Sequence, residues 1–91
     1  MKYVSYNFGY IVKIQPFDDG NTFVTIARDV NDIYTYIRLV ISNKTLIINQ
    51  ECNEIQVSDL SIGNCILVYH SNAMTASIPP QTNAFIMEVK F

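Results

Sequence analysis

The chain has few of the residues that usually perform chemistry or bind highly charged partners. Its 91 residues include one histidine, two cysteines, six basic and eight acidic side chains. The basic residues are scattered along the chain, whereas binding to a phosphate backbone needs several of them close together. The sequence therefore argues against nucleic acid as a partner.

Metal-binding and catalytic groupings are also missing from the sequence. A structural zinc site normally has four Cys or His ligands at short spacings, but Cys52 and Cys65 form no CxxC pair and His70 is the single histidine. No serine or cysteine stands in a recognisable nucleophile motif with His70. We expect no catalytic residue, no metal and no cofactor, and a protein that is not an enzyme.

The chain has no long apolar run and no export signal at its start. No uninterrupted apolar stretch reaches the roughly 18 residues that a membrane helix requires. Residues 1–7 carry one positive charge but neither an apolar segment nor a small-residue cleavage site. We expect a soluble, cytoplasmic chain without a membrane partner, folded as one small domain over residues 1–91. In the cytoplasm the cysteine thiols are expected to be reduced, although the sequence also allows a disulfide between Cys52 and Cys65. Cys65 is expected to be a small core residue.

What the sequence does contain is alternation of apolar and polar residues with a period of two, which is typical of half-buried strands. The expected strands cover residues 6–14, 22–28, 33–41, 45–48, 65–70 and 84–91. The first two should form an antiparallel hairpin around the turn at 16–21. Gly9, inside the first strand, predicts a bulge or a place where another backbone comes close.

The remaining segments have the composition of turns. Acidic residues in the turns at 16–21 and 29–32 lack the spacing of a calcium loop. Residues 58–63 predict a single helical turn, with Ser58 as N-cap and Gly63 as a left-handed end. Five or six strands with one short helical turn indicate an all-β fold, a small barrel of the oligonucleotide/oligosaccharide-binding (OB) type. A two-layer β-sandwich is the alternative.

Met74–Gln81 is an uncharged loop in which two adjacent prolines restrict the backbone. Such a loop is expected to hold one shape, with hydroxyls free to bond a partner. The outer face of strand 33–41 is the second candidate, because aromatics beside an arginine can stack on rings. The candidate interaction surface therefore consists of Thr75, Ser77, Ile78, Pro79, Pro80 and Gln81 on the loop, and of Tyr34, Tyr36 and Arg38 on the strand.

Each candidate also has a purely structural interpretation. The loop could be a stiff crossover that plugs one barrel end with Met74 and Ile78. The tyrosines could be ordinary cross-strand stabilisers, each pair worth roughly 0.2–1 kcal/mol.

Two segments, 57–68 and 72–84, resemble small uncharacterised bacterial proteins, mostly from Gram-positive anaerobes. The shared patterns are a DLxxGxxV step, which this chain follows from Asp59 with Ile66 in the place of the valine, and an MTxSxPPQxxA loop, which it carries from Met74. The resemblance implies an OB-like β-barrel and a bacterial source. It implies no activity.

Three functions remain open at this point. The first is a non-catalytic interaction module that holds a protein or peptide with the proline loop and the barrel face. The second is self-association into a dimer or larger oligomer that buries tyrosine-rich edge strands, with Tyr3, Tyr6 and Phe91 as candidates. The third is weak binding of an oligosaccharide or single-stranded nucleic acid, by analogy with the OB fold.

Overall fold

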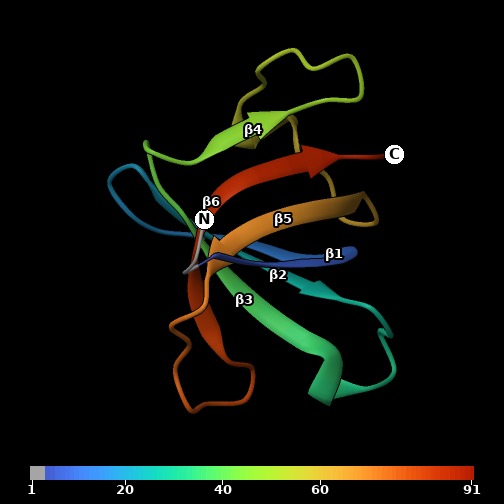
Figure 1. Ribbon diagram of the computed structural model, residues 1–91, viewed down its shortest axis with the longest axis vertical. Helices are drawn as coiled ribbons and strands as arrows, with labels where there is room; N and C mark the ends of the chain where they lie inside the picture. Colours follow the sequence, from blue (N-terminus) through green and yellow to red (C-terminus); the bar gives the residue numbers. More distant parts are fainter. Residues whose placement is uncertain (1–3) are drawn as a thin grey trace.

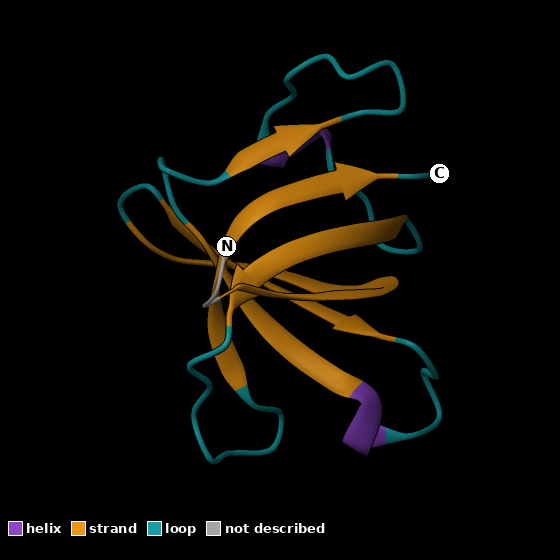
Figure 2. Ribbon diagram, in the orientation of Figure 1, coloured by secondary structure: helices purple, strands orange, loops and turns teal. Residues whose placement is uncertain are grey.

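The computed structural model describes residues 4–91, which form six strands and two short 3₁₀ turns (Figures 1 and 2). The elements are β1 (Val4–Asp18), β2 (Asn21–Ala27), η1 (Ile33–Thr35), β3 (Tyr36–Ile41), β4 (Leu46–Ile48), η2 (Val57–Asp59), β5 (Cys65–Ser71) and β6 (Gln81–Val89). Within this part of the chain, no helix is long and apolar enough to cross a bilayer.

Five of the strands close into a barrel. The sheet order is β3-β2-β1-β5-β6-β4, and an additional parallel pairing of β3 with β6 joins the ring. The short β4 adds to β6 outside the ring, at the top of Figure 1. The expected small OB-like barrel is confirmed, and the β-sandwich alternative is wrong.

The long strand β1 serves both halves of the barrel because it bends near its middle. Its first half, Val4–Tyr10, pairs with β5, and its second half, Tyr10–Asp18, pairs with β2. A Cβ atom on Gly9 would lie 2.9 Å from the carbonyl carbon and oxygen of Ala27. Gly9 therefore marks a close backbone approach, as predicted, and the irregularity in strand register follows it between Ile11 and Lys13.

The barrel interior is filled by one apolar cluster to which all six strands contribute. Its buried members are Ile11, Val24, Ile26, Leu39, Ile41, Ile47, Leu60, Ile66, Val68, Ala84 and Met87. On β1, the buried positions Gly9 and Ile11 alternate with Tyr6, Phe8 and Tyr10, which face solvent.

The third strand starts later than predicted. Residues Ile33–Thr35 form the 3₁₀ turn η1, because side chains before and within it bond the local backbone. The Asp32 carboxylate accepts the Tyr34 N–H at 3.0 Å, and the Thr35 hydroxyl lies 2.8 Å from the Asp32 carbonyl oxygen. Such local bonds compete with the sheet ladder. The prediction that the strand begins at Ile33 is wrong, since β3 begins at Tyr36.

Two further predictions need correction. The turn η2 begins after Gln56, so Ser58 lies inside it instead of capping it, while the Asp59 carboxylate accepts the Gln56 N–H at 2.9 Å. Gly63 does have the expected left-handed backbone, with φ of +95°. Cys65 is only half-buried, because the inward positions of β5 are taken by its neighbours, and both cysteines are free thiols.

Candidate functional site

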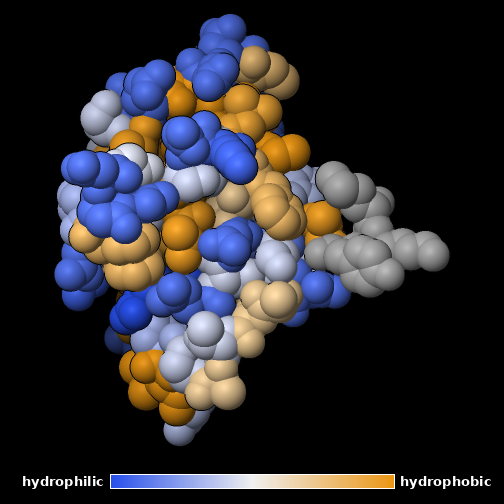
Figure 3. Space-filling view, turned by 90° about the vertical axis from the view of Figure 1, so that its left-hand side faces the viewer, coloured by the Kyte–Doolittle hydropathy of each residue, from blue (hydrophilic) through white to orange (hydrophobic). Residues whose placement is uncertain are grey.

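The loop between β5 and β6 projects from the lower end of the molecule in Figure 1. Ile78 is 65% exposed and Met74 is 40% exposed, so neither side chain plugs the barrel. Hydrophobic atoms accordingly gather at the lower end of the face seen in Figure 3. The loop therefore presents apolar side chains to solvent, and the predicted role as a barrel plug is wrong.

The loop is braced by its own hydroxyl groups. The Thr75 hydroxyl oxygen accepts the Gln81 N–H at 2.9 Å and lies 2.6 Å from the Ser77 hydroxyl oxygen, and the Ser77 hydroxyl donates to the Pro79 carbonyl at 2.8 Å. The Thr75 N–H in turn donates to the Gln81 carbonyl at 3.0 Å, and the Ile78–Pro79 peptide is cis. The hydroxyls predicted to be free for a partner are thus used within the loop, where they hold its shape.

Both ends of the loop are attached to the barrel. The buried Thr82 hydroxyl lies 2.7 Å from the Ser71 carbonyl oxygen and 2.9 Å from that of Ala73. On the other side, the Arg38 N–H donates to the Pro80 carbonyl at 2.9 Å. A shallow pocket of about 340 Å³ lies where the loop meets the barrel. Its lining residues are Val40, Ser71, Ala73, Met74, Thr75, Gln81, Thr82 and Asn83.

Next to this pocket, Arg38 lies beside two stacked phenylalanines. The Phe17 and Phe23 rings are nearly parallel, with centroids 3.9 Å apart, and the Arg38 guanidinium carbon is 5.2 Å from the Phe23 centroid. Cation–π contacts of this kind hold a guanidinium against a ring. The one salt bridge among residues 4–91 joins Lys90 to Glu88, so the Arg38 charge has no carboxylate partner there.

The two phenylalanines were not among the predicted site residues. The signal for Phe23 was present in the sequence, because the inward positions of β2 include Val24 and Ile26 and the alternation turns Phe23 outward. Phe17 lies within the segment predicted as a turn, and β1 instead continues to Asp18. Its contact with Phe23 depends on a register irregularity between Pro16 and Asp18, which composition does not reveal.

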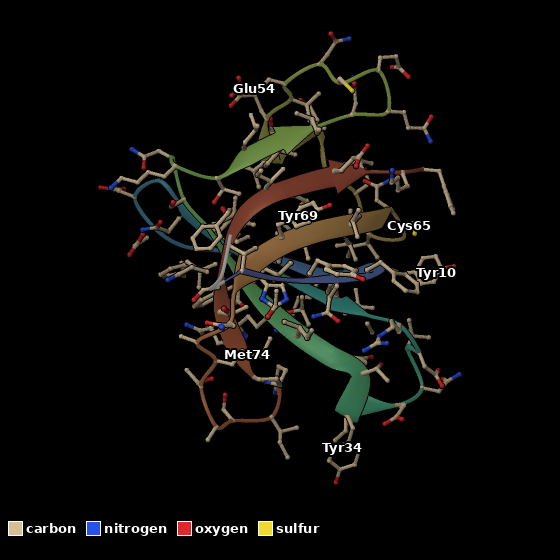
Figure 4. All side chains as sticks on the ribbon, viewed as in Figure 1. Tyr10, Tyr34, Glu54, Cys65, Tyr69 and Met74 are labelled. Carbon is tan, nitrogen blue, oxygen red and sulfur yellow. The ribbon has the colours of Figure 1, made fainter. Side chains whose placement is uncertain are left out.

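Of the two predicted tyrosines, Tyr34 does not lie on β3 with Arg38, whereas Tyr36 lies two residues before Arg38 on the same side of that strand. Tyr34 lies on η1 and is 80% exposed, at the same end of the molecule as Met74 but on a separate element (Figure 4). Tyr36 is half-buried, and its hydroxyl donates to the Val30 carbonyl at 2.7 Å. Arg38 is the member of this set that the structure brings to the loop, opposite Gln81 in the β3–β6 ladder.

The side chain of the single histidine is buried and hydrogen-bonded inside the protein. His70 is fully buried, with Nδ1 2.8 Å from the Ser71 carbonyl oxygen and Nε2 2.8 Å from the Asn7 side-chain nitrogen. A carbonyl only accepts hydrogen bonds, so Nδ1 carries the proton and Nε2 accepts from the Asn7 amide. Within residues 4–91, no three His, Cys, Asp or Glu side chains are grouped to hold a metal ion.

We use the term loop surface for the exposed side of the loop at 72–80, its shallow pocket, Arg38 and the Phe17–Phe23 pair. These parts are continuous because Phe23 lies opposite Val40 in the β2–β3 ladder, and Val40 lines the pocket. No model of a known protein family matches the chain, and a search of curated proteins finds no significant match. The resemblance in segments 57–68 and 72–84 therefore stays a prediction.

Proposed function

We propose that this protein is a non-catalytic interaction module that binds a protein or peptide through the loop surface. The observation that carries the proposal is the contrast within the loop at 72–80. Its backbone is fixed by the hydroxyl network around Thr75, yet its apex residue Ile78 is 65% exposed. A surface held in one shape before binding loses less conformational entropy when a partner arrives.

The charge of the loop surface indicates the chemistry of the partner. The sequence contains no Asp, Glu, Lys or Arg between Asp59 and Glu88, so the loop itself is uncharged. Arg38 supplies one cation at the edge of the pocket, held against Phe23. A peptide with an apolar side chain for the loop apex and a carboxylate or carbonyl for Arg38 fits this arrangement. A single arginine neutralises too few phosphates to support binding to nucleic acid.

Selection of binders from a displayed random-peptide library tests this proposal. Enriched peptides should bind the wild-type protein and lose most of their affinity for Ile78→Asp and for Arg38→Ala. The matched control is Ile62→Asp, since Ile62 is 67% exposed in the turn before β5, away from the loop surface. Peptides that bind Ile78→Asp as tightly as wild type, or a selection that yields no binder, would contradict the proposal.

A further inference from the structure

A second surface of the barrel is rich in exposed aromatic rings. It covers the outer side of β1, β5 and β6, and we call its five aromatic residues the aromatic face. Their exposed fractions are 68% for Tyr6, 53% for Phe8, 43% for Tyr10, 40% for Tyr69 and 41% for Phe85. None of these residues belongs to the loop surface.

The pairing of the strands makes the aromatic face continuous. Tyr6 lies opposite Tyr69 in the β1–β5 ladder, with ring centroids 6.1 Å apart, and Tyr69 lies opposite Ile86 of β6. Figure 4 shows Tyr69 on β5 and Tyr10 farther along β1, beside the start of β5. An apolar cleft of about 310 Å³ opens in the face, lined by Val4, Tyr6, Tyr69, Phe85 and Ile86.

The fold fixes these rings outside the core. Shifting β1 by one position would turn its aromatic residues inward. The close contact of Gly9 with the Ala27 backbone prevents that shift, because any other residue at this position would clash with a backbone that cannot move aside. The inward positions beside it, Ile11, Ile66 and Val68, are already almost completely buried. The barrel interior therefore has no room for the rings of the aromatic face.

The exposed area is large enough to matter for association. A Tyr or Phe side chain offers roughly 200 Å², so the exposed fractions leave about 500 Å² of aromatic surface in solvent. The largest apolar patch on a monomer reaches roughly 300–600 Å² and is commonly an interaction site. A stable interface buries about 800 Å² per partner. The aromatic face with Val4 and Ile86 supplies more than half of that.

We propose that the aromatic face binds a second copy of this chain in a two-fold symmetric dimer. Such an interface brings the same patch together from both sides, so the patch must complement itself. Every copy carries a formal net charge of −2, but β1 has no charged residue before Lys13 and β6 has none before Glu88. Glu88 lies in register with Leu67, which in turn pairs with Phe8, and its carboxylate is paired with Lys90 at 3.1 Å. Two aromatic faces can therefore meet without unpaired like charges in contact, and ring edges can pack on ring faces.

This surface differs from the one that the sequence suggested for self-association. The prediction relied on unprotected strand edges, whereas the pairing of β3 with β6 closes the barrel. Of the predicted residues, Tyr6 belongs to the aromatic face and lines its cleft. Phe91 is 65% exposed next to the start of β5, where its carbonyl accepts the Cys65 N–H. Tyr3 lies outside the described residues.

Sedimentation equilibrium of the full chain, from about 1 µM to about 1 mM, brackets the dissociation constants of weak and moderate dimers. We expect a dimer for the wild type. Tyr6→Lys and Phe8→Lys should each raise the dissociation constant at least about 30-fold, the effect of losing a hot-spot side chain and of facing two new like charges. Tyr34→Lys is the matched control, because Tyr34 is more exposed still but lies on η1.

A wild-type monomer over the whole range would overturn the proposal, and so would a dimer that both lysine substitutions leave intact. A dimer lost in Ile78→Asp but kept in Tyr6→Lys would place the interface on the loop surface and also overturn it. Circular dichroism verifies that each variant is folded, and Phe8→Lys decides the question if Tyr6→Lys is not. The peptide selection is independent of this outcome, because it uses variants of a different surface.

Discussion

At the scale of single residues, Gly9 determines how this sequence becomes a barrel. Its missing side chain lets β1 pass the Ala27 backbone and turn from β5 toward β2. The sequence predicted this function of Gly9, because a glycine inside a strand pattern commonly marks a bulge or a close approach. The sequence could not predict that the partner is the end of β2, since that contact depends on the hairpin register that places Ala27 opposite Tyr10.

Gly9→Ala should destabilise the fold. The added Cβ would lie 2.9 Å from two Ala27 backbone atoms, and backbone yields less readily than a flexible side chain. We expect the free energy of unfolding to fall by about 1–3 kcal/mol, as for other overpacked sites. Urea denaturation measures this loss. The control is Ser5→Ala on the same strand, which should change stability by less than about 0.5 kcal/mol. Equal effects of the two substitutions would rule out the close approach as the cause.

At the scale of elements, the two adjacent prolines predicted the exposure of the loop at 72–80 but not the hydrogen bonds within it. The two prolines correctly predicted a loop that carries exposed residues, and Ile78 is its exposed apex. The pattern could not predict that Thr75 and Ser77 use their hydroxyls within the loop, because that depends on how the chain returns to Gln81. It also could not predict η1, where hydrogen bonds that Asp32 accepts from the Tyr34 N–H and the Thr35 hydroxyl outweigh strand propensity.

Thr75→Val should loosen this loop without unfolding the barrel. The substitution keeps the shape of the side chain but removes the oxygen that accepts the Gln81 N–H. Loss of a hydrogen bond worth about 1 kcal/mol should speed exchange of the Gln81 amide roughly fivefold. Hydrogen exchange followed by NMR measures this rate, and amides of the buried core strands serve as internal reference. Thr75→Ser retains the hydroxyl and should exchange like wild type; an unchanged rate in Thr75→Val would exclude the bracing function.

At the scale of the whole molecule, the barrel separates two surfaces with different chemistry. The strand alternation predicted the β-barrel because an inward period of two survives in the first part of β1, in β3 and in β5. The aromatic face was visible in the sequence as the alternation of Tyr6, Phe8 and Tyr10, but the side of β1 that faces inward was not. That side depends on Gly9, which must face the interior where Ala27 crosses. The sequence therefore identifies the aromatic residues, whereas the strand register determines that their side chains are exposed.

If two copies share the aromatic face, unfolding and dissociation are coupled. The apparent melting temperature of the wild type should then rise with protein concentration, because mass action favours the folded dimer. For a domain of this size, a hundredfold increase in concentration should raise it by about 5 °C or more. Tyr6→Lys should melt at a temperature that does not depend on concentration, whereas Tyr34→Lys should behave like wild type. Calorimetry at several concentrations measures this difference. A wild-type melting temperature that stays constant would mean that the fold gains no stability from a second copy, and that the aromatic face remains exposed in the folded monomer.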